Sequence, residues 1–376
     1  MTDAAEVVGR LVLPDRVAAG RIRIGGDRIE DVDIDDGATV DESAPIVAPG
    51  FVDLHVHGFG GHDAMGGRDA LDGMARALAR RGVTSFLPTA VTAPLESLAA
   101  FADGVRAWMP SAPPDGAEPL GFNLEGPFLA EARKGAHDPV ALRAPAEVSP
   151  PDLAPLRDGL RVITIAPELP GALDLIRMLA SDGIAVSLGH SNATVDEAGA
   201  GFAAGARSTT HLFNAMSGLD HRSPGLALAA LLDDEVAVEL IADGHHVAPA
   251  IWPLVARLKP ASRLLLVSDA LAIAGTTADR GRIGRLACEV VGGRAVLAGT
   301  ETLAGSVIGL DDAVRNLSAA GVPLPHAVLA AAANPVDLLG RTDRGRLAAG
   351  RRADLVELDA GLRVRRVMRG GAWIDA

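Results

Sequence analysis

The stretch Pro49-Gly-Phe-Val-Asp-Leu-His-Val-His-Gly58 is the most informative segment of the chain for predicting its fold. It has the pattern of a short apolar strand that carries His55 and His57 two positions apart, so both imidazole rings project from one side. If this is the first strand of a barrel, that side is the interior, where two imidazoles can bind one metal ion. A polar strand end with two incidental histidines is the alternative interpretation. The rigid Val47-Ala-Pro-Gly50 before the strand favours an entry into a new domain.

Beyond this strand the sequence alternates between apolar strands and alanine-rich segments of helical spacing. Such alternation is typical of a parallel sheet with helical crossovers. Predicted helices include residues 70–81, 95–109, 172–181 and 195–204, in which apolar residues recur at helical intervals. Eight strand candidates end near the following residues: His57, Pro88, Glu125, Glu168, His190, His211, Asp243 and Asp269. Eight such units predict an α/β fold with a closed (β/α)8 barrel of the TIM type.

The two ends of the chain have a different character from the middle. Short strands separated by Gly and Asp are predicted near the N-terminus at residues 7–13, 21–24 and 28–34, and near the C-terminus at 353–358, 362–368 and 372–374. We expect residues 1–49 and 346–376 to form one small β-sandwich domain, with the barrel at 50–345. Within the barrel, a hairpin is predicted at 282–298 and helices at 310–320 and 326–339.

Composition and charge exclude several classes of protein. Apolar residues make up 48% of the 376 residues and charged residues 22%, which indicates a folded globular chain. The formal charge of −13 argues against nucleic acid or an anionic membrane as partner, and no apolar run reaches the roughly 18 residues of a membrane span. Cys288 is the single cysteine and the first residues lack the pattern of a secretory signal, so we expect a cytoplasmic protein.

Polar side chains recur where the predicted strands end. They are Glu125, His190, His211, Asp243 and Asp269, each after an apolar strand. Barrel enzymes carry their chemistry at the C-terminal ends of the strands. A single histidine at such a place is more often structural, but an ordered set of histidines and carboxylates predicts that the side chains converge on one site.

The first-strand segment resembles the signature of the amidohydrolase superfamily. Further stretches are similar to motifs of the N-acetylglucosamine-6-phosphate deacetylase family: Asn123-Leu-Glu-Gly-Pro-Phe128, Leu188-Gly-His-Ser-Asn192, Thr210-His-Leu-Phe-Asn-Ala-Met216, Asp243-Gly-His-His-Val247 and Val267-Ser-Asp-Ala270. The resemblance spans nearly the whole chain, to Gly350-Arg-Arg-Ala-Asp-Leu-Val356. The set of motifs is specific, whereas any one of them alone would be weak.

The resemblance implies a divalent-metal amide hydrolase. Carried over by motif, Glu125, His190 and His211 bind the principal metal and Asp269 is the general acid/base. Such ligands suit Zn2+ or Fe2+, and three protein ligands leave a position open for water. An ionised Asp269 would accept a proton from the attacking water and deliver it to the leaving amine.

The number of metal ions, one or two, is left open by the sequence. Many members of the superfamily bridge two metals with a carboxylated lysine, but Lys134 and Lys259 are the only lysines and neither stands at the fourth strand end. Glu125 would have to be the bridge. Some deacetylases of the family lack one histidine of the first-strand pair, whereas this chain keeps both His55 and His57, which allows a second ion.

The resemblance also implies how a phosphorylated amino sugar would be bound. His137, in Lys134-Gly-Ala-His137, is expected to contact the acetyl carbonyl or a sugar hydroxyl. Arg222 and His246 are expected near the phosphate, with His246 preferred over its neighbour His245, because arginine donors suit phosphate. Two further contacts are implied at Asn214 and Ala215. In the family the arginine can reach across a dimer interface, which implies a homodimer.

The implied reaction is hydrolysis of N-acetyl-D-glucosamine 6-phosphate to D-glucosamine 6-phosphate and acetate, in amino sugar catabolism. Two alternatives stay open at this point. One is another N-acyl substrate, such as N-acetylgalactosamine 6-phosphate. The other is a catalytically silent binding protein, although such a relative would be expected to have lost a metal ligand or the acid/base carboxylate, and none is missing here.

Overall fold

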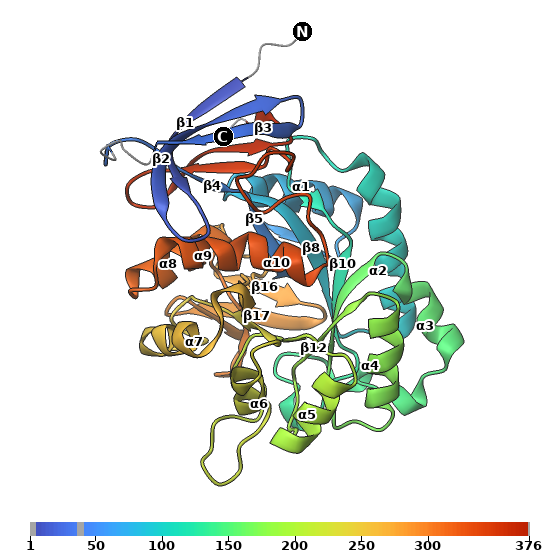
Figure 1. The fold of residues 1–376 in the computed structure, drawn as a ribbon. Coiled ribbons are helices and arrows are strands. Elements are labelled where there is room, and N and C mark those ends of the chain that lie inside the picture. Colours follow the sequence, from blue (N-terminus) through green and yellow to red (C-terminus); the bar gives the residue numbers. More distant parts are fainter. Residues whose placement is uncertain (1–4, 36–40, 375–376) are drawn as a thin grey trace.

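A parallel barrel forms the body of the molecule (Figure 1). The computed structural model describes residues 5–35 and 41–374. Eight parallel strands follow one another in hydrogen-bonded order: β5 (Phe51–Val56), β8 (Val83–Val91), β10 (Phe122–Glu125), β11 (Leu160–Ile165), β12 (Ala185–Leu188), β13 (Ser208–Thr209), β14 (Ala237–Leu240) and β15 (Leu264–Leu266). The circle closes where the N–H of Asp269 donates to the carbonyl of His55 at 2.9 Å and the N–H of His57 donates to that of Ala270 at 2.9 Å. The predicted barrel is confirmed.

Every barrel strand ends within three residues of its predicted end, and only β8 runs past it. β8 runs to Val91 instead of ending near Pro88, and β11 ends at Ile165 instead of near Glu168. All nine residues of β8 are buried. A fully buried parallel strand has no alternation of polar residues to mark its end, which explains the difference.

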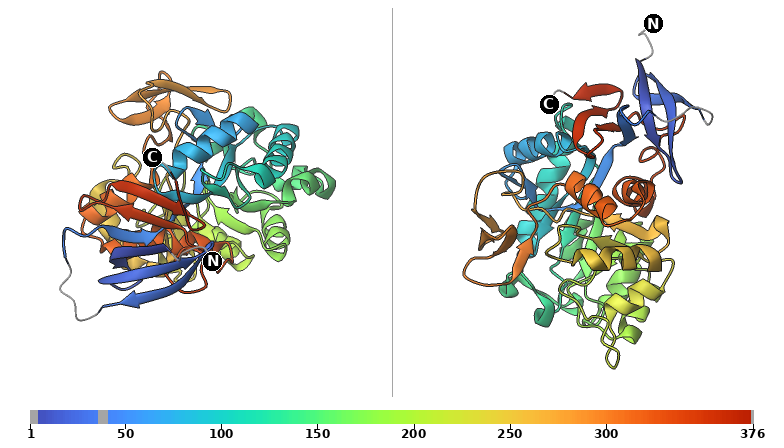
Figure 2. Two further views of the ribbon diagram at one scale, coloured as in Figure 1. Left: turned by 90° about the horizontal axis from the view of Figure 1, so that it is seen from above. Right: turned by 90° about the vertical axis from the view of Figure 1, so that its left-hand side faces the viewer.

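Helices cover the outside of the barrel (Figures 1 and 2). They are α1 (Arg68–Ala79), α2 (Leu95–Trp108), α3 (Pro150–Arg157), α4 (Ala172–Ser181), α5 (Val195–Ala203), α6 (Leu226–Leu232), α7 (Trp252–Leu258), α8 (Leu310–Ala319), α9 (Leu324–Ala331) and α10 (Ala333–Leu338). The segment predicted as one helix at 326–339 is two, because Ala332 leaves the helical region and Pro335, which lacks an N–H, fits the first turn of a new helix. Among the described residues, no helix is long and apolar enough to cross a membrane.

Both ends of the chain contribute to one seven-stranded sheet beside the barrel, drawn in blue and red in Figure 1. Its strands are β1 (Ala5–Val12), β2 (Val17–Gly25), β3 (Arg28–Ile34), β4 (Ile46–Pro49), β20 (Leu355–Leu358), β21 (Val364–Arg369) and β22 (Ala372–Ile374). β4 joins the two halves, since it pairs with β1 on one side and with β20 on the other. Leu11, Ile22, Leu355 and Met368 share one buried apolar cluster across these halves. The boundaries at residues 49 and 346 remain a prediction.

A second sheet is inserted between β15 and α8 and lies to one side of the barrel (Figure 2). The predicted hairpin at 282–298 is part of its four strands: β16 (Arg280–Ile283), β17 (Leu286–Val291), β18 (Arg294–Leu297) and β19 (Leu303–Gly305). Ile283 and Cys288 pack with Leu271 in a small apolar cluster. The N–H of Ser306 donates to the carbonyl of Asp269 at 2.7 Å, so the insertion reaches the mouth of the barrel.

Candidate metal centre and active site

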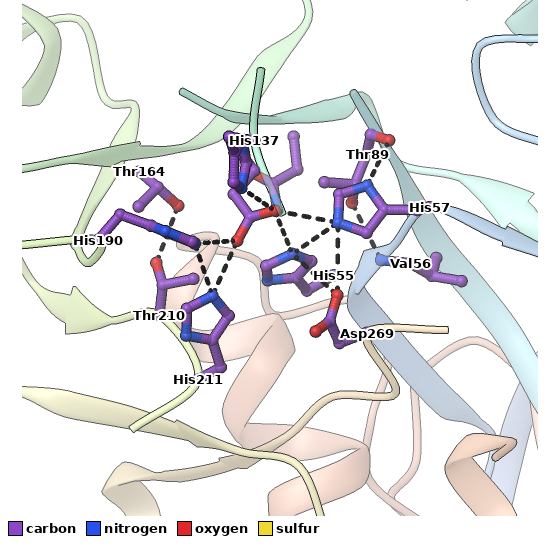
Figure 3. Close-up of polar contacts among 12 residues, drawn as sticks. His55, Val56, His57, Thr89, His137, Thr164, His190, Thr210, His211 and Asp269 are labelled. Carbon is purple, nitrogen blue, oxygen red and sulfur yellow. Dashed lines mark hydrogen bonds and ion pairs between the residues drawn. The ribbon is translucent and has the colours of Figure 1, made fainter. Parts of the chain in front are cut away.

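Buried histidines gather at the mouth of the barrel (Figure 3), and the Glu125 carboxylate contacts two pairs of them. Its Oε2 lies 3.0 Å from Nε2 of His57 and 3.5 Å from Nε2 of His55. Its Oε1 lies 3.0 Å from Nε2 of His190 and 2.8 Å from Nε2 of His211. Each carboxylate oxygen therefore faces one histidine pair, and the carboxylate lies between the two pairs.

The barrel strands explain why these side chains meet. His55 lies in β5 and His57 directly follows it, so both rings project from one face, as expected for residues two apart. His190 and His211 follow β12 and β13 with φ angles of 47° and 29°, values that are rare for residues other than glycine. Asp269, after β15, has a φ of 48°. Such backbone conformations cluster at functional sites because the surrounding structure has to hold them in place.

The outward-facing nitrogens fix the tautomers of three of the four histidines. Nδ1 of His57 lies 3.2 Å from the carbonyl of Thr89, and Nδ1 of His190 lies 2.8 Å from the carbonyl of Arg133. A carbonyl can only accept, so Nδ1 carries the proton in both rings. Nδ1 of His55 lies 3.2 Å from the Glu239 carboxylate, which places its proton in the same way. The Nε2 lone pairs are thereby left to face Glu125.

The charges at the centre favour the binding of a cation. Two nitrogen pairs, His55 with His57 and His190 with His211, approach to 3.3 and 3.1 Å, where two lone pairs would repel each other. Burial lowers the pKa of His57, but hydrogen bonds to Asp269 and Glu125 outweigh it and raise that pKa to about 9. Burial by itself would raise the pKa of Glu125, yet the surrounding histidines hold it well below the ordinary value. The carboxylates of Glu125 and Asp269, which raise the pKa of His57, also favour the binding of a metal cation at this point.

Two donor groups in the centre could hold a metal ion, and they share one residue. One group is His55, His57 and Glu125, and the other is Glu125, His190 and His211; within each, the donor atoms lie within 4.8 Å of one another. Imidazole nitrogens with a carboxylate are the donors that Zn2+ and Fe2+ accept. The arrangement therefore fits a divalent cation, and the shared carboxylate is compatible with one ion or two.

The metal-free protein is expected to lose stability as pH rises from about 6.5 to about 9. The folded pKa of His57, about 9, lies above its ordinary value, so its protonation stabilises the folded state below about 6.5 and this contribution disappears by about 9. The pKa values of His55 and His211 are raised as well. Thermal unfolding of metal-stripped protein over this range tests the prediction. Zinc-loaded protein should show a much weaker decline, and equal declines in both forms would contradict the account.

His137 differs from the four other histidines in its hydrogen bonds. Its Nδ1 lies 2.7 Å from the hydroxyl of Thr92, which donates to the carbonyl of Glu125, and 3.3 Å from the backbone N of Thr92. Its Nε2 lies 3.3 Å from Oε2 of Glu125. Burial, which the Glu125 carboxylate only partly offsets, lowers the pKa of His137 to about 4. His137 is therefore a neutral imidazole at physiological pH, and its Nε2 is directed toward the same centre.

Asp269 is a second carboxylate in contact with His55 and His57. Its Oδ1 lies 3.3 Å from Nε2 of His57 and 3.6 Å from Nε2 of His55. Burial raises its pKa, but the hydrogen bond to His57 and the charges of the two histidines outweigh this and lower it. Asp269 is thus an ionised base in contact with the cavity.

A cavity of about 400 Å³ opens over the centre, a size that suits a small-molecule ligand. The sequence-predicted residues that line it are His57, Glu125, His137, His190, His211, Asn214, Ala215, His246 and Asp269. The inserted sheet contributes Ile283, Leu303 and Ala304 to its wall. His55 lies behind this surface, fully buried.

Arg222 and His245 do not line the cavity. Arg222 is exposed on the loop before α6, and the described chain does not bring it to the cavity. His245 is exposed, whereas Nδ1 of its neighbour His246 lies 2.7 Å from the Asp243 carboxylate, which also accepts the N–H of both histidines. Of the two adjacent histidines, only His246 faces the cavity.

Several residues of the site were not singled out by sequence reasoning. Glu239 contacts His55, and Thr92 contacts His137. Arg133 lines the cavity, and its carbonyl accepts from His190. The only sequence signal for any of them is a polar residue within or after an apolar strand, as at Glu239 in Ala237–Leu240.

Comparison with known families agrees with this geometry. The model of the amidohydrolase family matches residues 46–374, nearly the whole chain. The chain belongs to the amidohydrolase family. The family predicted from the first-strand motif is confirmed.

Similar proteins share most of the length of this chain. N-acetylgalactosamine-6-phosphate deacetylase of Escherichia coli O157:H7 is 39% identical over 343 residues, which cover 90% of this chain and 89% of the relative. N-acetylglucosamine-6-phosphate deacetylase of Bos taurus is 39% identical over 344 residues, which cover 88% of this chain and 83% of the relative.

Solved structures of amidohydrolases show the same fold. The crystal structure of N-acetylglucosamine-6-phosphate deacetylase from Thermotoga maritima has a TM-score of 0.91 at 32% identity and covers 99% of both chains. An Asp-to-Ala mutant of the Mycobacterium smegmatis enzyme, in complex with N-acetyl-D-glucosamine-6-phosphate, has a TM-score of 0.90 at 38% identity and covers 99% of this chain and 100% of that one.

Proposed function

We propose that this chain hydrolyses N-acetyl-D-glucosamine 6-phosphate to D-glucosamine 6-phosphate and acetate, as a step of amino sugar catabolism. The observation that carries the proposal is the position of the ionised Asp269 at a cavity whose floor is the Glu125 carboxylate between two histidine pairs. The M. smegmatis relative, whose structure holds this sugar phosphate, supports the choice of substrate.

Asp269 is the base and acid of the proposed reaction. As an ionised carboxylate at the cavity it can accept the proton of an attacking water. The protonated carboxyl then returns that proton to the nitrogen of the leaving amine as the C–N bond breaks. With its proton on Nε2, His137 would present an N–H to the same space and hydrogen-bond the acetyl carbonyl as its oxygen gains negative charge.

The cofactor is proposed to be one or two ions of Zn2+ or Fe2+. Glu125, His190 and His211 would hold the first, and His55, His57 and Glu125 would hold the second where two are bound. When bound, such a cation supplies Lewis-acid polarisation of a carbonyl and makes a water easier to deprotonate. The chain's own side chains keep the donor atoms oriented through their outward hydrogen bonds.

Acetate release from N-acetylglucosamine 6-phosphate tests the proposal. Metal-stripped protein should be inactive and should regain turnover as Zn2+ or, in a separate series, Fe2+ is added. Zinc-loaded protein that releases no acetate, while a known deacetylase does so in parallel, would overturn the substrate assignment. It would leave the alternatives of a different N-acyl substrate or of a catalytically silent binding protein.

The phosphate is proposed to lie near His246, with Asn214 and Ala215 contacting the sugar. Replacing His246 by alanine should raise KM for the phosphorylated sugar about 10-fold or more, because a charge-assisted hydrogen bond contributes roughly 1.5–3 kcal/mol. Steady-state kinetics with N-acetylglucosamine 6-phosphate and with N-acetylglucosamine measure this, and the change should be confined to the former. His245→Ala, at an exposed neighbour outside the cavity, is the matched control. Equal effects of the two substitutions would contradict the placement of the phosphate.

Hydrolysis of N-acetylgalactosamine 6-phosphate is the second candidate function. It is favoured by the E. coli O157:H7 relative of that name, which is 39% identical to this chain. The two sugars differ only in the orientation of one hydroxyl, so kcat/KM measured for both epimers on one protein sample decides between them.

A cytoplasmic homodimer is the proposed form of the enzyme. Arg222 is exposed outside the cavity, and an apolar hollow beside His246 is lined by Phe213, Leu219 and Leu254. Leu219 and Leu254 are 43% and 42% exposed, as expected of a surface that a second subunit covers. Arg222 would then reach the phosphate in the partner's site.

Mixing two inactive variants tests this arrangement. Arg222→Ala subunits lack the arginine and Asp269→Asn subunits lack the base, so a mixed dimer should regain one complete site. We expect activity to rise several-fold above that of either variant once subunits exchange, as measured by acetate release. No recovery in a mixture whose subunits demonstrably exchange would contradict an arginine supplied across the interface.

A further inference from the structure

Glu239 is a buried carboxylate that stands behind the first histidine pair. It lies in β14, and 1% of the residue is exposed. Its Oε2 lies 3.2 Å from Nδ1 of His55 and accepts the backbone N–H of His211 at 3.2 Å. Neither the family match nor the proposed chemistry of the cavity assigns this residue a role, and it does not line the cavity.

Within the described part of the chain, no lysine or arginine forms an ion pair with Glu239. Burying an ionised carboxylate is costly unless an opposite charge compensates it. Among residues 5–35 and 41–374, the only ion-pair partner of Glu239 is His55, and its Oε1 has no hydrogen-bond partner. Glu239 therefore interacts with the metal centre by way of His55, whose other ring nitrogen faces Glu125 and Asp269.

We infer that Glu239 is a positioning residue that holds His55 with its proton on Nδ1 and its Nε2 lone pair toward the cation site. Thr89 and Arg133 do the same for His57 and His190 through backbone carbonyls, which no side-chain substitution removes. Only for His55 is the acceptor a side chain, and a charged one. A carboxylate behind a metal-binding imidazole also makes that imidazole a stronger ligand.

The same oxygen connects the two donor groups. By accepting the N–H of His211, whose φ is 29°, Glu239 helps to hold the backbone that presents the second group, while its contact with His55 orients the first. The contact with His211 involves only the backbone, so the orientation of its ring does not depend directly on Glu239. We therefore expect the larger effect of Glu239 at the group formed by His55, His57 and Glu125.

The inference rests on the proposed metal centre, and zinc binding tests it without any substrate. Metal-stripped wild type, Glu239→Gln, His55→Ala and the double variant are titrated with Zn2+ against a chromophoric chelator. Mutation of an outer hydrogen-bond partner lowers metal affinity about 10- to 100-fold, and Glu239→Gln removes the charge that makes His55 a stronger ligand while keeping one acceptor oxygen. We expect Glu239→Gln to weaken by this factor the same zinc-binding step that His55→Ala removes. The double variant should bind zinc no more weakly than His55→Ala alone.

Three results would overturn the inference. The first is zinc binding by Glu239→Gln that equals that of wild type. The second is a double variant in which the losses of zinc affinity from Glu239→Gln and His55→Ala add in full. The third is a loss of zinc affinity in Glu239→Gln when His55→Ala loses none. Wild type that binds no zinc would overturn the metal proposal itself, whereas absent acetate release from zinc-binding protein would affect only the substrate assignment.

Two further variants guard against a general structural effect. Glu357→Gln changes a glutamate of the terminal sheet whose side chain is only 8% exposed, and it should leave zinc affinity unchanged. Glu239→Asp keeps the charge but withdraws the acceptor from Nδ1, so it should also weaken zinc binding. If Glu239→Gln does not fold, Glu239→Asp with wild-type affinity would equally overturn the inference. Nitrogen NMR of ring-labelled, zinc-loaded protein should show His55 protonated on Nδ1 in wild type and altered in Glu239→Gln.

Discussion

Asp269→Asn is expected to lower kcat for deacetylation by about 10²- to 10⁴-fold, the range that general acid–base catalysis contributes. Asparagine keeps the size of the side chain but can neither accept the proton of water nor return it to the amine. The hydrogen bonds that tie the backbone of residue 269 to His55 and Ser306 are unaffected by the substitution. KM should therefore change much less than kcat. Acetate release at saturating substrate measures the effect.

The control for this prediction is a buried aspartate elsewhere in the barrel. Asp311 in α8 has a side chain that is 6% exposed and pairs with Arg81, and it does not line the cavity. Asp311→Asn should leave kcat near that of wild type, even if it lowers the melting temperature. An Asp269→Asn variant that retains zinc and full activity would remove Asp269 from the mechanism.

Glu125→Gln is expected to cause the largest loss of metal. Both donor groups contain this carboxylate, and each of its oxygens faces one histidine pair, so neutralising it weakens both groups together. We expect zinc affinity to fall by more than about 100-fold, beyond the 10- to 100-fold that follows from loss of an outer hydrogen-bond partner. Activity should be lost with the metal. Metal analysis after dialysis, together with acetate release, gives both values.

His57→Asn is the comparison that separates a bridging carboxylate from an ordinary ligand. His57 belongs to one donor group only, so its replacement should leave the group of Glu125, His190 and His211 able to bind zinc. If Glu125→Gln and His57→Asn lose zinc to the same extent, Glu125 does not serve both donor groups.

The alternation in β5 and the polar residues at successive strand ends made much of the centre predictable from sequence. His55 and His57 share a face because residues two apart in a strand must do so. Glu125, His190, His211 and Asp269 meet because a parallel barrel brings all its strand ends to one rim. These are consequences of topology, which the βα alternation indicates.

The supporting hydrogen bonds were not predictable in the same way. Glu239 looks like an ordinary polar residue in a short apolar strand, and its direction depends on the register of β14 within the barrel. The carbonyls of Thr89 and Arg133 leave no side-chain signature, since any residue provides one. The role proposed for Arg222 requires a second subunit, which the sequence of one chain cannot position.

The most direct test of the account is the crystal structure of Asp269→Asn with Zn2+ and N-acetylglucosamine 6-phosphate, with zinc located by its anomalous scattering. We predict zinc at about 2.0–2.2 Å from Glu125 and the Nε2 atoms of His190 and His211. The acetyl group should lie between this ion and residue 269, and the phosphate near His246. Zinc bound away from Glu125, or a sugar whose acetyl group points out of the cavity, would contradict the account.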